Sequence, residues 1–261
     1  MIKPLTELFD RVYVINCSYR KDRLVALEAN FKQMGVADFS QVRIFKGVEG
    51  DKVGTPPYWK WGRGAWGCYQ SHCGVVADVL NSEERCRSIL ILEDDVCFNT
   101  SSLVETNYLM NHIPPDWDQV YLGGQHDSRP KFTVNPLILK ATSVHRAHAY
   151  GLNEKVFKKF YAHLNNAPEF VQEKETHVDH HLQAAHREKK WNVYCPLKWV
   201  AGQDAGESDI AHGTTPSGCC SKKIEPRRRY WFLSDSKGGL KAHNADSYFM
   251  GDKAPIYTSL N

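Results

Sequence analysis

The hydrophobic pattern of the chain is clearest at residues 89–92, where Ile-Leu-Ile-Leu precedes three consecutive acids, Glu93, Asp94 and Asp95. A short, continuous apolar run with β-branched residues is typical of a strand buried on both faces. Other apolar runs predict further strands at residues 12–16, 42–45, 118–124, 137–139, 147–150 and 191–194. The three acids therefore lie at the carboxyl end of the best-defined strand.

Between these runs, apolar residues recur at spacings of three and four, which predicts amphipathic helices. Leu24, Leu27 and Phe31 form such a stripe after residue 20, and Asp22 is the expected N-cap of that helix. Further helices are expected around residues 66–80 and from about residues 102, 153 and 178. The alternation of strands and helices predicts an α/β fold.

The periodic pattern fades near residue 212 and gives way to a Gly/Pro-rich segment with basic residues at 222–229. This change predicts one domain over residues 1–212 and a basic C-terminal extension over residues 213–261. The extension is interpreted as a tail, an arm that wraps the domain, or a region that binds an acceptor. Its basic residues permit an anionic partner, nucleic acid included, without favouring one.

Composition excludes little. Of the 261 residues, 42% are hydrophobic and 24% are charged, which is ordinary for a globular protein, and a net charge of +3 does not by itself indicate nucleic-acid binding. No apolar stretch reaches the length of a membrane span, and the N-terminus has no signal-peptide pattern. The eight cysteines form no Cys-x-x-Cys pair, and several lie in apolar segments, which favours reduced thiols and a cytoplasmic location.

The acids at residues 93–95 are the first candidate for chemistry. Open α/β sheets bind ligands at the carboxyl ends of their strands. Adjacent carboxylates held there repel one another and favour a hard divalent cation such as Mg²⁺ or Mn²⁺. The alternative is an acidic turn that only keeps the strand end in contact with water.

Two further groups are expected around the same pocket. Asn16, Arg20 and Arg23 lie in a strand–turn–helix connection, where backbone N–H groups and a helix N-terminus favour the anionic part of a nucleotide. Ser71 and His72 lie off the apolar stripe of their helix and are predicted to flank the pocket. The alternatives are surface arginines and a structural histidine.

Several motifs together resemble the family 25 glycosyltransferases, which include lipopolysaccharide and collagen sugar transferases. The family's opening strand and turn are similar to Val14-Ile15-Asn16 with Arg20 and Arg23, although Cys17 stands where a leucine is usual. The signature Gly-x-x-Gly-Cys-x-x-Ser-His matches residues 64–72, and the metal motif matches residues 90–95. Further matches follow in the family's order at 117–118, 121–123, 149–150, 178–180 and 208–210.

The resemblance implies a GT-A fold, a single Rossmann-like α/β domain with a mixed, mostly parallel sheet. It implies a metal-dependent, inverting hexosyltransferase that moves galactose or glucose from a UDP-sugar to a hydroxyl of a glycan, lipopolysaccharide-like or other polymer. Asp95 is the expected ligand of Mn²⁺ or Mg²⁺, with Asp94 assisting directly or through water, and Glu93 belongs to the same donor site. His212 is a weaker candidate for a third ligand, the alternative being a surface histidine.

Asp179 is the predicted general base. An inverting transfer needs a carboxylate on the face opposite the leaving diphosphate, and Asp179 lies at a predicted helix start, held by free N–H groups. The same position lowers the pKa of a carboxylate and weakens it as a base, and an Asp there also serves as a simple cap. The substitutes are Glu173, Glu175 and His148.

Two rival interpretations remain open. The first is a metal-dependent hydrolase built on the His/Asp cluster of residues 177, 179, 180, 181 and 186, although the chain has no His-Glu-x-x-His core. The second is an inactive module that binds a sugar nucleotide or a glycan. Intact acids at residues 93–95 weigh against the second, because an inactive protein has no need to keep them.

Overall fold

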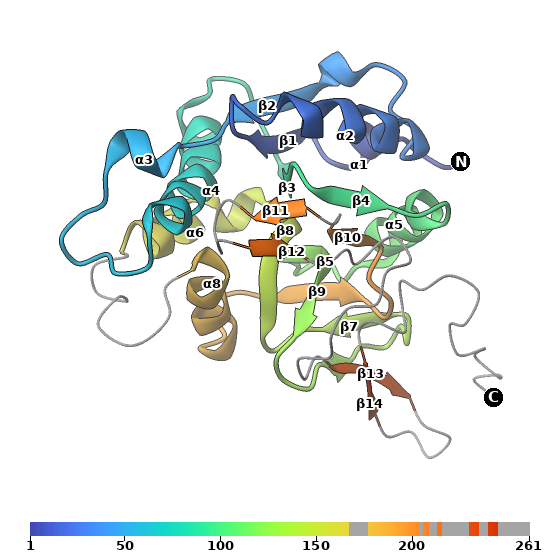
Figure 1. The fold of residues 1–261 in the computed structure, drawn as a ribbon. Coiled ribbons are helices and arrows are strands. Elements are labelled where there is room, and N and C mark those ends of the chain that lie inside the picture. The colour runs from blue at the N-terminus through green and yellow to red at the C-terminus, as the bar shows by residue number, and fades with distance from the viewer. Residues whose placement is uncertain (167–176, 204–205, 209–212, 216–229, 235–239, 245–261) are drawn as a thin grey trace.

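The computed structural model describes residues 1–166, 177–203, 206–208, 213–215, 230–234 and 240–244. Its centre is an eight-stranded sheet, drawn in Figure 1, in the order β2 (Val42–Lys46), β1 (Arg11–Asn16), β3 (Ser88–Glu93), β8 (Val144–Asn153), β5 (Gln119–His126), β9 (Val193–Pro196), β7 (Ile138–Lys140) and β6 (Lys131–Phe132). Strands β8 and β7 run antiparallel to both of their neighbours, and the other six share one direction. The predicted α/β fold with a mixed, mostly parallel sheet is confirmed.

Helices cover both faces of this sheet, as the α/β pattern requires. On one face, α4 (Arg63–Asn81), α6 (Phe157–Asn165) and α8 (Val178–Arg187) pack on a core that contains Ile89, Ile91 and Tyr150. On the other face, α1 (Leu5–Leu8), α2 (Lys21–Gln33) and α5 (Ser102–His112) pack on a core that contains Leu90 and Leu92. Because β3 contributes alternate residues to both cores, its apolar run is continuous rather than alternating.

Short elements complete the connections. They are η1 (Phe39–Gln41), α3 (Gly50–Val53), β4 (Val96–Phe98), η2 (Glu154–Val156), β10 (Ala201–Gln203), β11 (Gly206–Ser208), β12 (Gly213–Thr215), β13 (Tyr230–Ser234) and β14 (Leu240–Asn244). Of these, β4 follows the three acids directly and pairs antiparallel with β10, which sets Gln203 opposite Val96. This pairing brings a segment more than one hundred residues away to the end of β3.

Asp22 is not the N-cap of α2, contrary to the sequence prediction. The helix begins at Lys21 with Arg20 at the N-cap position and no side-chain cap. A turn in which the Arg20 N–H donates to the Cys17 carbonyl (2.9 Å) precedes it, so the chain enters helical geometry two residues earlier than the capping pattern indicates. Asp22 pairs instead with Arg20 (3.4 Å).

The proposed boundary at residue 212 stays a prediction, although β11 and β12 pair with each other across it. Cys17, Cys68, Cys73, Cys86 and Cys195 form no disulfide, as expected, whereas Cys97 is disulfide-bonded, contrary to the prediction of reduced cysteines. Within the described ranges, no helix has the length and apolar character that crossing a membrane requires.

Candidate functional site

A cavity of about 440 Å³ opens at the carboxyl ends of β1 and β3, where open α/β sheets place ligands. Parallel pairing sets Ile15 of β1 opposite Glu93 of β3, so residues that follow both strands meet at this edge. The cavity is lined by Ile15, Cys17, Tyr19, Arg23, Val48, Glu49, Gly50, Asp51, Lys52, Arg63, Gly64, Cys68, Ser71, His72, Glu93, Asp94, Asp95 and Gln203. The predicted turn after β1, the Ser71–His72 segment and the three acids therefore come together.

Asp94 joins the end of β1 to the start of α2. The Asn16 amide donates to its Oδ2 (2.7 Å), and the Arg23 guanidinium donates to its Oδ1 (2.5 Å). Asn16 also donates to the Arg20 carbonyl (3.0 Å), which fixes the turn. Burial raises the pKa of Asp94, and Arg23 opposes that rise. Both oxygens of Asp94 are thus engaged by protein donors, so a part in metal binding through an intervening water fits better than direct ligation.

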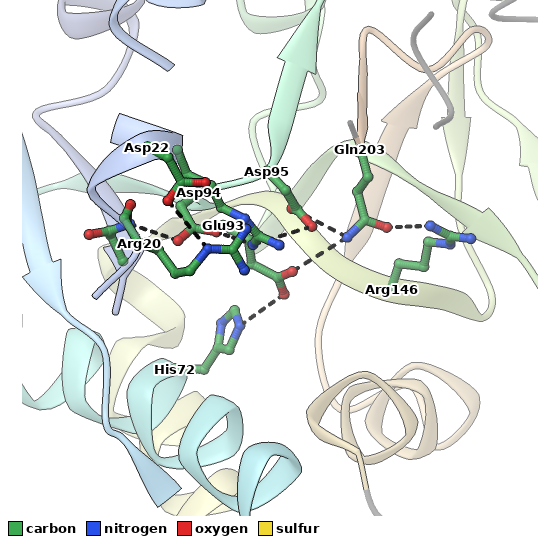
Figure 2. Close-up of polar contacts among 10 residues, drawn as sticks. Arg20, Asp22, His72, Glu93, Asp94, Asp95, Arg146 and Gln203 are labelled. Atoms are coloured by element: carbon green, nitrogen blue, oxygen red, sulfur yellow. Dashed lines mark hydrogen bonds and ion pairs between the residues drawn. The ribbon is translucent and has the colours of Figure 1, made fainter. Parts of the chain in front are cut away.

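Glu93 and Asp95 converge on one amide group. Gln203 Nε2 lies 3.5 Å from Glu93 Oε2 and 3.5 Å from Asp95 Oδ1. Figure 2 draws both contacts as dashed lines. The Gln203 carbonyl oxygen in turn accepts from the Arg146 guanidinium. Burial, followed by the charge of Glu93, raises the pKa of Asp95 to about 7. The two carboxylates are therefore costly to ionise together without a cation.

This arrangement fits a hard divalent cation. Two carboxylate oxygens of half-buried side chains face the same point, where Gln203 makes long contacts to both and Arg23 lies 3.9 Å from Asp95. Oxygen ligands of this type suit Mg²⁺ and Mn²⁺. Asp95 as a metal ligand stays a prediction, and His212 lies outside the described residues.

Ser71 and His72 both lie on the buried side of α4, at the floor of the cavity. The Ser71 hydroxyl donates to the Gly67 carbonyl (2.7 Å) and accepts from the Val48 N–H (2.8 Å), so it ties the helix to the loop after β2. The His72 ring bonds to the Tyr150 hydroxyl through Nδ1 (2.9 Å) and points its Nε2 at Glu93 Oε1, 3.4 Å away.

Asp179 lies outside the lining of this cavity, at the second residue of α8, whose N-cap is His177. Its Oδ2 accepts from His145 Nε2 (2.9 Å) and from the Arg146 N–H (3.1 Å), and its Oδ1 accepts from the His180 N–H (2.9 Å). Burial alone raises the pKa of Asp179, but the hydrogen bond and charge of His145 outweigh burial and hold that pKa well below its usual range.

Arg146 connects the Asp179 cluster with the acids of β3. Its backbone has a left-handed φ of 73°, which turns its N–H toward Asp179. Its guanidinium reaches the Gln203 side chain, which contacts Glu93 and Asp95 (Figure 2). The predicted base and the predicted metal ligands are therefore joined through two intervening side chains.

The five residues of the rival hydrolase site do not form one cluster. Asp179 and His180 gather with His145, which the sequence reasoning did not include. His181 bonds to the Tyr69 hydroxyl (2.5 Å) and His186 to Gln119 (2.9 Å), and burial lowers the pKa of each to about 3. These two are buried histidines of the α8 interface.

Of the three residues considered as alternative bases to Asp179, the structure describes one. His148 is 3% exposed, and burial, assisted by Arg146, lowers its pKa to about 4. Glu173 and Glu175 lie outside the described residues. Gln203, Arg146 and Cys68 are site residues that the sequence reasoning missed; only Cys68 carried a signal, since it lies four residues before His72 on one helix.

Comparison with known proteins leaves the family unassigned. No family model matches the chain, and no curated protein sequence matches it. Among solved structures, a glycosyltransferase involved in the glycosylation of the major capsid of PBCV-1 is 10% identical, with a TM-score of 0.33 over 60% of this chain and 69% of that one. The nucleoside-diphosphate-sugar pyrophosphorylase from Vibrio cholerae RC9 is 14% identical, with a TM-score of 0.37 over 73% and 74%.

A third structure, A197 from STIV, is 8% identical, with a TM-score of 0.38 over 84% of this chain and 100% of that one. Likeness at this level identifies no relative. The resemblance to family 25 glycosyltransferases therefore stays a prediction, and the functional argument rests on the site itself.

Proposed function

We propose that the chain is a metal-dependent glycosyltransferase that takes a hexose from a nucleotide sugar, with UDP-galactose or UDP-glucose as donor. The observation that supports this most is the convergence of Glu93 and Asp95 on Gln203 at the carboxyl ends of β1 and β3. Two half-buried carboxylates that face one point of a cavity, with the pKa of Asp95 raised by burial and by the charge of Glu93, favour the binding of a divalent cation.

Three basic side chains also line the cavity. They are Arg23, which contacts Asp94, and Lys52 and Arg63, which pair with Glu49 (2.6 Å) and Asp51 (3.7 Å) of the same lining. A nucleoside diphosphate needs basic side chains together with a cation, because its phosphates carry several negative charges. Asn16 and Arg20 fix the turn beneath this position, and Ser71 and His72 fix the floor.

The proposed reaction is a single displacement at the anomeric carbon. The acceptor oxygen forms a bond to that carbon as its bond to the diphosphate oxygen breaks, and the nucleoside diphosphate leaves with the electron pair. A cation held by Glu93 and Asp95 supplies neutralisation of the charge that develops on this leaving group. The acceptor's proton passes to a base of the protein.

We propose Asp179 and His145 as that base, acting as a pair. Although burial raises the pKa of Asp179, the hydrogen bond and charge of His145 and the charges of neighbouring histidines lower it by more, so the carboxylate by itself accepts a proton poorly. The His145 side chain is 32% exposed and lies 2.9 Å from Asp179, which orients the ring. Asp179 thus keeps the role predicted for it, but shares it with the imidazole.

The test is turnover of a panel of nucleotide sugars. The full chain is incubated with UDP-, GDP- and CMP-sugars plus Mn²⁺ or Mg²⁺, and release of the nucleotide is followed with and without glycan acceptors. We expect slow hydrolysis of one UDP-hexose, seen as release of the nucleotide, in the presence of the metal and no release in the presence of EDTA. Thermal stabilisation by UDP and Mn²⁺ without any release would indicate a binding module instead. Metal-dependent hydrolysis of unrelated esters with indifference to UDP-sugars would favour the hydrolase.

A further inference from the structure

The buried ring of His72 has one nitrogen in use and one without a hydrogen bond. His72 is fully buried, and its Nδ1 is engaged by the Tyr150 hydroxyl at 2.9 Å. Among the described residues, Nε2 has no hydrogen-bond partner. A buried polar nitrogen without a partner costs about 1–3 kcal/mol, so such an atom calls for an explanation.

Nε2 points into a cluster of potential metal ligands. The Cys68 thiol, the His72 imidazole and the Glu93 carboxylate each offer one atom, and these atoms all lie within 4.8 Å of one another. Cys68 and His72 are four residues apart on α4, so one helix face presents both, and Glu93 completes the cluster from the end of β3. Tyr150 orients the ring through its other nitrogen, as partners of metal-binding histidines do.

The separation of the two nearest atoms also fits a shared ion. His72 Nε2 and Glu93 Oε1 are 3.4 Å apart without hydrogen-bond geometry. Nitrogen and oxygen ligands at about 2.0–2.2 Å from one tetrahedral ion lie roughly 3.3–3.5 Å from each other. A thiol, an imidazole and a carboxylate are the ligand types that zinc-class ions accept, and Mg²⁺ disfavours the first two.

In the second cluster of the same kind, His145, Asp179 and His180, the atoms that face one another are already within hydrogen-bond distance. His145 Nε2 lies 2.9 Å from Asp179 Oδ2 and 3.0 Å from His180 Nε2, which are hydrogen-bond distances. An ion would have to break these contacts first. The His145, Asp179 and His180 cluster therefore serves as the competing site in the experiment described below.

We propose that Cys68, His72 and Glu93 form a binding site for a zinc-class divalent cation, separate from the hard-cation position beside Asp95. The Glu93 carboxylate divides the two positions, because Oε1 faces His72 and Oε2 faces Gln203 (Figure 2). Three protein ligands leave a fourth coordination position for water or for a group of a molecule in the cavity. This inference does not need the proposed glycosyl transfer, since the site is tested without any nucleotide.

The experiment is a Co²⁺ titration of the full, metal-free chain in oxygen-free buffer, because Co²⁺ reports its ligands by absorption. The wild type should give a thiolate-to-cobalt charge-transfer band in the near ultraviolet, at one ion per chain, which Zn²⁺ abolishes by displacement. Cys68→Ser should lose the band. His72→Gln should bind Co²⁺ more weakly by at least the roughly 10–100-fold that loss of a merely orienting partner costs.

Three matched variants test whether other potential ligands produce the charge-transfer band. Cys17→Ser removes the other thiol that lines the cavity, His145→Gln disrupts the competing cluster, and Asp95→Asn removes the hard-cation ligand. All three should keep the charge-transfer band. Loss of UDP binding in Asp95→Asn with the band intact would concern only the donor site, so failure of the two proposals is distinguishable.

A measurement on the wild type guards against misfolded variants. Alkylation by iodoacetamide, mapped by mass spectrometry, should be slowed by Zn²⁺ at Cys68 and unchanged at Cys17. A charge-transfer band that survives Cys68→Ser, Co²⁺ binding that disappears only in His145→Gln, or alkylation of Cys68 that ignores Zn²⁺ would each overturn the proposal.

Discussion

Asp95→Asn should stabilise the metal-free protein, and more so as the pH rises. The substitution keeps the size of the side chain and removes one of two carboxylates that face Gln203. Burial and the charge of Glu93 raise the pKa of Asp95 from 3.8 to about 7. A residue that destabilises its own fold in this way is expected where a ligand is to be held.

The sign and the size follow from proton binding. Between pH 3.8 and about 7 the unfolded chain releases the Asp95 proton while the folded chain keeps it, so the free energy of unfolding falls as pH rises. A shift of about three units at ~1.4 kcal/mol per unit sets an upper limit of about 4 kcal/mol above neutral pH. About 2 kcal/mol of this should develop between roughly pH 5.5 and pH 8.

The assay is urea denaturation followed by tryptophan fluorescence, with EDTA present, for wild type and variant at each pH. Comparing the two proteins at one pH cancels the titration of all other groups. Asp127→Asn, at an acid whose side chain is 57% exposed, is the control and should stay within about 0.5 kcal/mol of wild type. If Asp95→Asn is less stable than wild type at pH 8, or its gain is the same at both pH values, the reasoning is refuted.

Three further predictions concern the base, the floor of the cavity and the buried histidines. Asp179→Asn should lower kcat by roughly 10²–10⁴-fold while UDP binding with Mn²⁺ is kept; steady-state kinetics with near-normal turnover would contradict the base role. Gly67→Ala should lower the free energy of unfolding by about 1–3 kcal/mol or more. A Cβ at this position would lie 2.2 Å from the Val48 carbonyl oxygen and 2.8 Å from the Gly50 nitrogen. An unchanged midpoint of urea denaturation would contradict this prediction. Burial lowers the pKa of His148 to about 4 and that of His186 to about 3. The free energy of unfolding should therefore fall as the pH drops below about 6.5, because the unfolded chain then binds more protons than the folded chain. Unfolding measured at several pH values without proton uptake would contradict this.

Local sequence patterns predicted the framework of the site. The apolar run of β3 and the acids after it are contiguous, so their position at a strand end follows from chain order alone. The turn after β1 reached the same edge because neighbouring parallel strands end together. Pattern reasoning failed at Asp22, where a hydrogen-bonded turn after Cys17 started the helix earlier than the capping residue indicated.

Long-range pairing supplied what the sequence could not. Gln203 reaches Glu93 and Asp95 because β10 pairs with β4. A local sequence pattern does not predict strand pairing between segments more than one hundred residues apart. Arg146 depends on an irregular register between β5 and β8 and on a left-handed backbone at a non-glycine residue. His145 lies beside Arg146 on the same irregular part of β8 and contacts Asp179 at 2.9 Å. The sequence predicted Asp179 as a base by itself, whereas the structure pairs this carboxylate with an imidazole.

Metal-dependent donor binding through Asp95 is tested most directly by isothermal titration calorimetry. UDP is titrated into the wild-type full chain with Mn²⁺, into the wild type with EDTA, and into Asp95→Asn with Mn²⁺. We expect heat of binding for the wild type with Mn²⁺, a strong loss of affinity with EDTA, and the same loss in Asp95→Asn even with Mn²⁺ present. Equal UDP affinity in all three titrations would contradict a cation held between Glu93 and Asp95 as the basis of donor binding.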